Sequence, residues 1–233
     1  MDVDRLEANL RDVESRIARA ARESGRDVAG ITLVAVTKKR SIESIRSLVA
    51  LGVASLGENY PQELWDKAEA LADLPVEWHH IGHLQGNKAR KTLPLVRMLH
   101  GVDSAKLLLS LDGMVGVSSP QSSLDVCLQV NISAESNKHG WSPEELFADL
   151  PTIRAVKTMR IVGLMTMAAV DTEGAAARPG FARLRAIRDR LATELGRPLP
   201  VLSMGMSGDF EAGVLEGATH VRIGSALFEG AGS

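Results

Sequence analysis

Lys38 is placed in this sequence where a lysine can carry out covalent chemistry. It follows the apolar run Ile31–Val36, whose β-branched residues predict a strand buried on both faces. A lysine that leaves such a strand can project into a pocket, where an apolar wall and neighbouring cations favour the neutral amine that forms a Schiff base with an aldehyde. Lys39 comes next, and strand parity alone does not choose between the two lysines. The alternative is that both lysines only mark a solvated strand end.

Two segments rich in glycine and serine, Ser203–Phe210 and Val221–Ala226, predict a phosphate site. Many barrels bind phosphate after their seventh and eighth strands, on backbone N–H groups at a helix start. Glycines let the backbone approach a ligand closely, and Ser207 and Ser225 add hydroxyl donors. The alternative is that Gly224 and the other glycines only shape tight loops. A lysine amine opposite a phosphate cup suits a ligand with an aldehyde and a phosphate, such as pyridoxal 5′-phosphate.

Short apolar runs alternate with helical patterns along the chain. An apolar stripe predicts an opening helix, and Phe181–Leu195 shows helical spacing most clearly. Strands that alternate with helices form parallel β–α units, and eight of them in roughly the ~250 residues typical of the fold predict a single (β/α)8 TIM barrel. The predicted strands are Ile31–Val36, Val53–Leu56, Val76–Ile81, Arg97–Val102, Leu124–Val130, Ile161–Met165, Pro200–Met204 and His220–Ile223.

The whole chain, residues 1–233, is expected to form one domain. The runner-up fold is an open doubly wound sheet, but no Gly-x-Gly-x-x-Gly follows the first strand. No linker rich in Pro, Gly and Ser divides the sequence, and Val115–Ser123 is expected to be an ordinary loop.

Polar residues follow each predicted strand. In a TIM barrel the carboxyl ends of the strands form one rim, so these residues would converge on one site. The acidic ones could equally be caps of the following helices. In chain order they are Lys38, Glu58 with Asn59, His83, Asp103, Asn131, Thr166, Ser207, and Gly224 with Ser225.

Composition excludes several classes of protein. The 233 residues include 27 Lys and Arg and 29 Asp and Glu, giving a net charge of −2 without a basic stripe for nucleic acid. No apolar stretch approaches the ~20 residues that span a bilayer, and the charged start does not resemble a signal peptide, so we expect a cytoplasmic protein. Cys127 is the only cysteine and is expected to be a buried, inert thiol.

Motifs along nearly the whole chain resemble the YggS/PROSC family of pyridoxal phosphate homeostasis proteins. The resemblance implies a barrel like the N-terminal domain of alanine racemase, fold type III among proteins that bind this cofactor. It also implies a cofactor held as an internal aldimine on Lys38 rather than Lys39. The motifs that carry it are Leu33–Lys38, Gly57–Tyr60, Trp78–Lys88, Val130–Ile132, Gly163–Met167, Leu202–Ser207 and Val221–Ala226.

The resemblance assigns further cofactor contacts. Arg222 would face the pyridine nitrogen, and because a guanidinium keeps its proton, it would leave that nitrogen unprotonated and weaken the ring as an electron sink. The phosphate would be held by Ser207, Gly224 and Ser225. Residues expected around the ring are Asn59, His79 and Met165.

Three positions depart from the pattern of the family. His80 stands where an aromatic apolar residue is usual, Pro61 replaces an aliphatic residue, and Gly86 replaces a small hydroxyl residue. Pro61 lacks an N–H and could alter the start of the following helix. The histidines at 79, 80 and 83 raise the question of a metal site. We expect none, because residues 79 and 80 point to opposite faces of a strand and no cysteine or nearby carboxylate completes a ligand set.

Three classes of function remain open. We favour a monomeric, non-catalytic carrier that binds, buffers and delivers pyridoxal 5′-phosphate, with apo-enzymes as transient partners. An amino-acid racemase is the alternative. Racemisation needs a base on each face of the cofactor, which alanine racemases supply with a lysine and a partner's tyrosine, together with a second domain. Tyr60 is the only tyrosine here, and the sequence ends ten residues after Ile223, so we do not expect that enzyme. The third class is a regulatory protein with a structural cofactor.

Overall fold

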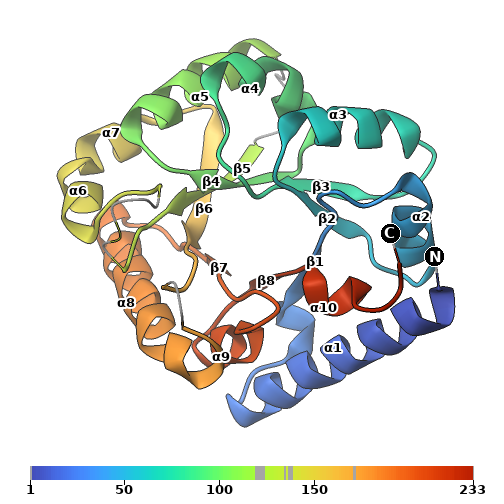
Figure 1. Cartoon of the computed structure of the whole chain (residues 1–233). Helices are drawn as coiled ribbons and strands as arrows, with labels where there is room; N and C mark the ends of the chain where they lie inside the picture. Colours follow the sequence, from blue (N-terminus) through green and yellow to red (C-terminus); the bar gives the residue numbers. More distant parts are fainter. Residues whose placement is uncertain (1, 119–123, 134, 136–138, 170–171, 233) are drawn as a thin grey trace.

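Eight parallel strands close into a barrel in the computed structural model of the chain. Each strand pairs with its neighbours in sequence, and β1 pairs with β8 to complete the ring (Figure 1). The structure describes residues 2–118, 124–133, 135, 139–169 and 172–232. The strands are β1 (Thr32–Val36), β2 (Ser55–Glu58), β3 (Glu77–His80), β4 (Met98–Val102), β5 (Leu124–Gln129), β6 (Met159–Met165), β7 (Val201–Ser203) and β8 (His220–Ile223).

Helices surround the ring of strands, and the first of them packs beside the last (Figure 1). The N-cap residue Asp2 donates its backbone N–H to the Ala231 carbonyl at 2.8 Å, which ties the two ends of the chain together. The helices are α1 (Val3–Glu23), α2 (Ile42–Ala50), α3 (Pro61–Ala70), α4 (Gly86–Thr92), α5 (Ala105–Ser118), α6 (Pro143–Ala148), α7 (Leu150–Ala155), α8 (Arg178–Leu195), α9 (Phe210–Leu215) and α10 (Ser225–Phe228).

The predicted barrel is confirmed, and all eight predicted strands are present with ends that differ by at most two residues. The predicted helix Phe181–Leu195 lies within α8, and Pro61 is the first residue of α3, where a missing N–H costs no hydrogen bond. The predicted loop Val115–Ser123 is wrong in its first part. Residues up to Ser118 belong to α5, because Val115 continues the buried helical stripe of Leu108 and Leu111; residues 119–123 lie outside the described part.

The two faces of the barrel wall differ in chemistry. Outward-facing side chains such as Leu56, Leu99 and Val221 pack under the helices in one large apolar core. The inward face is partly polar, which the apolar strand patterns did not predict. Rings of His79, His100 and His220 gather there with centroids 5.1 to 6.1 Å apart. Cys127 is buried in a small apolar cluster, as expected, and burial raises the pKa of its thiol.

None of the described helices is both long and apolar enough to cross a membrane.

Candidate functional site

Lys38 lies in a tight turn directly after β1. The turn is closed by a hydrogen bond from the Arg40 N–H to the Thr37 carbonyl at 3.0 Å. Lys39 has φ of 59°, a left-handed conformation that residues other than glycine rarely adopt. The chain therefore reverses immediately beyond Lys38, whose side chain is exposed at the carboxyl end of the barrel.

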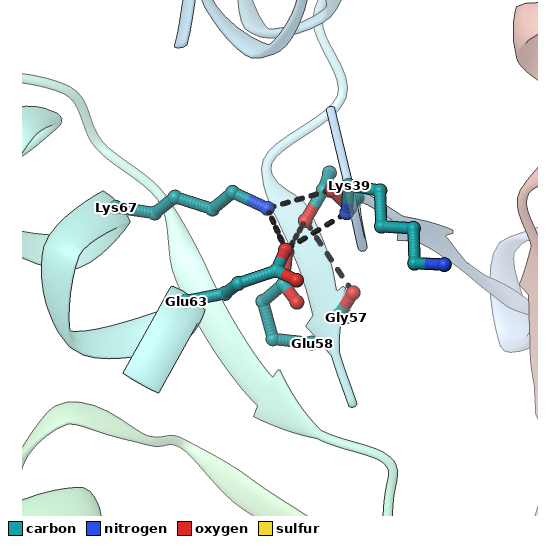
Figure 2. A network of polar contacts seen from close by, with 6 residues as sticks. Lys39, Gly57, Glu58, Glu63 and Lys67 are labelled. Atoms are coloured by element: carbon teal, nitrogen blue, oxygen red, sulfur yellow. Dashed lines mark hydrogen bonds and ion pairs between the residues drawn. The ribbon is translucent and has the colours of Figure 1, made fainter. Parts of the chain in front are cut away.

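A network of charged groups forms hydrogen bonds with the backbone of this turn on both sides of Lys38. Lys67 Nζ donates to the Thr37 carbonyl at 2.8 Å and bridges Glu58 at 2.6 Å and Glu63 at 2.8 Å. Glu63 in turn accepts the Lys39 backbone N–H at 2.8 Å. Figure 2 shows these groups converging while the Lys39 side chain points away from them. The network therefore fixes the peptide groups that flank Lys38.

The Glu58 carboxylate is the most enclosed member of this network. Its side chain is fully buried and also accepts the Thr37 hydroxyl at 2.7 Å. Burial raises the pKa of Glu58, and the hydrogen bonds from Lys67 and Thr37 oppose that rise. Partial burial acts to raise the pKa of Glu63 as well, but bonds from Lys67 and the Lys39 backbone lower it overall. Lys67 therefore compensates two carboxylates at once.

Ser207 forms the centre of a cup of backbone N–H groups. Its Oγ accepts from the N–H of Gly224 at 3.3 Å and from the N–H of Ala226 at 3.2 Å. These donors flank Ser225, the first residue of α10, so the predicted phosphate residues Ser207, Gly224 and Ser225 are brought together. Both N–H groups donate to the Ser207 oxygen, so the hydroxyl hydrogen of Ser207 is the donor left for a ligand.

The cup and the Lys38 turn are neighbours. A Cβ on Gly224 would lie 3.2 Å from the Cβ of Val36, closer than most real contacts, so the cup packs tightly on the end of β1. The Arg40 guanidinium lies over the Phe228 ring, 4.4 Å from its centroid, and links the same two loops. The Ser207 cup therefore lies beside the strand end that leads to Lys38, two residues past Val36.

Arg222 is buried inside the barrel and paired in register with Val34 of β1. Its Nη1 donates to Ser203 Oγ at 2.6 Å and its Nη2 donates to the Thr166 carbonyl at 2.9 Å. Burial lowers the pKa of Arg222 to about 10, which leaves it protonated at neutral pH. Two of its five N–H donors are used by these bonds, so the guanidinium retains capacity to bind a ligand.

A chain of hydrogen bonds runs from Arg222 across the barrel to His79. Ser203 Oγ lies 2.6 Å from His100 Nδ1, and His100 Nε2 lies 2.9 Å from His79 Nδ1. Arginine only donates, so the Ser203 hydroxyl gives its hydrogen to His100, and both histidines then carry their proton on Nε2. His79 Nε2 is left buried without a partner among the described residues.

The three clustered histidines are held in their neutral form. Burial lowers the pKa of His79 to about 3 and that of His220 to about 4, and it lowers the pKa of His100 well below its ordinary value. Neighbouring cationic groups add to the effect. The alternating donors and acceptors of the hydrogen-bond row likewise require His79 and His100 to be neutral.

Met165 and Asn59 are the remaining predicted contacts. Met165 is buried at the end of β6, next to the Thr166 carbonyl that binds Arg222. Asn59 is half-buried after β2 and lines a cavity of about 300 Å³ with Gly82 and His83. The hydrogen bonds of Arg222 go to Ser203 and Thr166 and not to Asn59.

Four residues of the site were missed by the sequence reasoning. Lys67 and Glu63 are four apart on α3, a spacing that indicates a pair on one helix face but not which turn it holds. Ser203 and His100 lie inside predicted strands that are mostly apolar. Their alternation with apolar neighbours was the only sequence signal that they face the barrel interior. Their roles depend on contacts between distant strands.

The expectation that no carboxylate lies near the histidines at 79, 80 and 83 is wrong. Asp103, at the end of β4, has its Oδ2 2.6 Å from His83 Nδ1. The two residues are twenty apart in sequence, and parallel pairing of β3 with β4 places the ends of these strands side by side. His79, in contrast, faces the barrel interior and takes no part in this pair.

Comparisons with known proteins agree on one family. Residues 1–231 match the family described as alanine racemase, N-terminal domain. A pyridoxal phosphate homeostasis protein of Pseudomonas aeruginosa is 42% identical over 220 residues, which are 94% of this chain and 93% of that protein. One from Aquifex aeolicus is 37% identical and covers 94% and 95%.

Solved structures give the same result. PipY of Synechococcus elongatus with pyridoxal phosphate (PLP) bound is 35% identical and superposes with a TM-score of 0.79, covering 91% of this chain and 99% of that one. An alanine racemase of Clostridium difficile is 15% identical, with a TM-score of 0.73 over 97% of this chain and 59% of its own. The racemase shares the barrel fold.

Proposed function

The chain belongs to the family of pyridoxal phosphate homeostasis proteins, and from this premise we propose that it binds pyridoxal 5′-phosphate, holds it in store and delivers it to enzymes that need it. The observation that carries the proposal is the cup around Ser207, packed on the strand that ends at Lys38. A phosphate-binding loop and a primary amine on adjacent loops match the phosphate and the aldehyde of this cofactor. In the proposal the whole chain, residues 1–233, acts as one cofactor-binding domain.

Each site residue has a distinct task in this proposal. Lys38 supplies the amine that bonds to the aldehyde, and its turn is held by the Lys67 network. Ser207, Gly224 and Ser225 hold the phosphate, with charge-assisted hydrogen bonds of the kind that bind anions most strongly. The exposed position of Lys38 would favour delivery, because this end of the site is open to an incoming molecule.

In the proposal the ring is held by residues of the barrel interior together with Asn59, which follows β2. Arg222 would face the pyridine nitrogen and donate a hydrogen bond to it, and because this guanidinium keeps its proton, it would leave that nitrogen unprotonated. The bound vitamin supplies an electron-withdrawing ring, and a nitrogen left unprotonated makes that ring a weaker electron sink. His79, Met165 and Asn59 complete the surroundings of the ring. This arrangement favours storage over turnover of amino acids.

Borohydride reduction followed by peptide mapping tests the proposal. The purified protein should be yellow, and reduction of the carbon–nitrogen double bond should fix the vitamin on the peptide that contains Lys38. Lys38→Ala should abolish the adduct, whereas the neighbouring Lys39→Ala should retain it as a matched control. An adduct on Lys39, or no adduct in protein saturated with the vitamin, would exclude this assignment.

A further inference from the structure

His83, Asp103 and His139 form a cluster beside the proposed cofactor site, since His83 also lines the cavity that contains Asn59. They follow three consecutive strands, β3, β4 and β5, so the topology of the barrel brings them to one rim. His83 Nδ1 lies 2.6 Å and His139 Nδ1 lies 3.6 Å from the same carboxylate oxygen of Asp103. The two imidazole rings are stacked, with centroids 4.4 Å apart and planes 15° from parallel.

We propose that these three side chains bind a divalent transition-metal ion, with Zn²⁺ as the best match. Two imidazoles and one carboxylate are ligands that this ion commonly takes in proteins. One ligand atom from each residue can be chosen so that all three lie within 4.8 Å of one another. Donors around a tetrahedral ion with bonds of about 2.1 Å are roughly 3.4 Å apart. His139 and Asp103 are already near that spacing, and the His83 pair must open slightly.

The backbone holds the donors in place although two of them are exposed. Gln129 Nε2, from the end of β5, donates to the His139 carbonyl at 2.9 Å. The next residue, Gly140, has φ of 115° and packs so closely that a Cβ would lie 2.8 Å from the Gln129 carbonyl oxygen. Asp103 follows β4 directly, and its side chain is only 7% exposed. The carboxylate at the centre is therefore the most sheltered donor.

Space for further ligands adjoins the cluster. A cavity of about 510 Å³ is lined by His83 and Asp103 together with Ser104 and Ser110. A second cavity, of about 290 Å³, opens on Asp103 and Gly140. Three protein donors leave at least one position of a zinc ion open, and these cavities give water or a small anion room to fill it. The site is therefore of the open, exchangeable type.

The competing explanation is a plain hydrogen bond between a histidine and an aspartate, with no metal. That arrangement explains the 2.6 Å contact of His83, and ring stacking then holds His139 with its Nδ1 3.6 Å from the same oxygen. The two explanations differ in what happens when Zn²⁺ is added.

Zinc titration of chelator-treated protein by calorimetry is the test, carried out with and without bound vitamin. The wild-type chain should bind one Zn²⁺, and His83→Gln, Asp103→Asn and His139→Gln should each weaken binding at least tenfold. Glu144→Gln removes an exposed carboxylate on the nearby α6 and should leave binding unchanged. Circular dichroism melts check that each variant is folded.

X-ray absorption at the zinc edge identifies the ligands independently of the variants. It should show nitrogen and oxygen donors with the scattering pattern of two imidazoles and no sulfur. The proposal is overturned if folded wild-type protein takes up no stoichiometric Zn²⁺ at millimolar concentration. It is also overturned if the three variants bind Zn²⁺ as tightly as the wild type, or if the spectrum lacks imidazole.

Discussion

Arg222 donates from Nη1 to the Ser203 hydroxyl at 2.6 Å, and both groups are buried inside the barrel. The Ser203 hydroxyl in turn donates to His100, and His100 donates to His79. One permanently charged guanidinium thus sets the donors and acceptors of a whole row of neutral side chains.

Ser203→Ala should disturb this row. Arg222 loses an acceptor and His100 loses a donor, and leaving buried groups unsatisfied costs about 1–3 kcal/mol of unfolding free energy. The absorption maximum of the bound vitamin should also shift, because the guanidinium is less fixed. Urea unfolding and a visible spectrum measure the two effects. Ser15→Ala, on an exposed face of α1, is the control and should change neither quantity. If Ser203→Ala equalled the wild type in both stability and spectrum, Ser203 would not link Arg222 to His100 as described.

Ser207→Ala should weaken the binding free energy of pyridoxal 5′-phosphate by about 1–2 kcal/mol, since it removes a hydrogen bond to a charged phosphate. The same substitution should not affect pyridoxal, which has no phosphate and should bind much less tightly to either protein. Fluorescence or absorbance titrations with both aldehydes separate the effects. Equal affinity of the wild type for the two aldehydes would place the phosphate cup elsewhere.

Lys67→Met should destabilise the fold by about 3 kcal/mol or more, because it leaves the buried Glu58 carboxylate next to Glu63 without a cation. The turn around Lys38 should loosen, and the bond to the vitamin should form more slowly. Stopped-flow absorbance after mixing with the vitamin reports the rate. Arg46→Ala breaks the exposed pair with Asp73 and should have little effect on either quantity.

If Lys67→Met were as stable as the wild type, the network would not support the turn. Normal stability with a normal rate of bond formation would contradict both parts of the argument.

Acidification should destabilise the protein before most carboxylates are protonated. Burial lowers the pKa of His80 and His220 to about 4, whereas the unfolded chain protonates its histidines below about 6.5. The unfolded state therefore binds more protons between these values, and unfolding free energy falls as pH drops from about 6.5 toward 4. Each such histidine contributes about 1.4 kcal/mol per pH unit in that window.

Urea unfolding at pH 7, 6 and 5 measures this slope. His220→Gln should reduce the slope by roughly the share of one histidine, about 1.4 kcal/mol per pH unit. A wild-type stability that stays flat down to pH 5 would mean that the buried rings are charged in the folded protein.

Protein with bound pyridoxal 5′-phosphate should transfer this cofactor to an apo-enzyme without turning over amino acids. A lysine can take an α-proton from one face of a substrate, but racemisation also needs a group on the other face. Tyr60, the only tyrosine of the sequence, is 48% exposed at the rim. Incubation with L- and D-alanine in deuterated water should give little α-deuteration, while an added apo-enzyme regains activity. Deuteration with inversion at ~1–10³ s⁻¹ would favour the racemase instead.

The sequence alone determined the architecture and the outer parts of the site. Apolar runs alternating with helical stripes are local patterns, so they located all eight strands and predicted a closed barrel. In that fold the carboxyl ends of the strands share one rim, which was enough to expect Lys38 and the Ser207 loop on the same end of the molecule.

Contacts between distant strands were decided only by the tertiary structure. The register of β1 against β8 and the closure of the ring place Arg222, Ser203 and His100 in one row, although they come from three strands and look like ordinary interior positions. For the same reason, the sequence did not predict the contact between Asp103 and His83. A pattern with a period of two residues tells which face a side chain takes but not which partner it meets across the barrel, because register and shear depend on the packing of the whole ring.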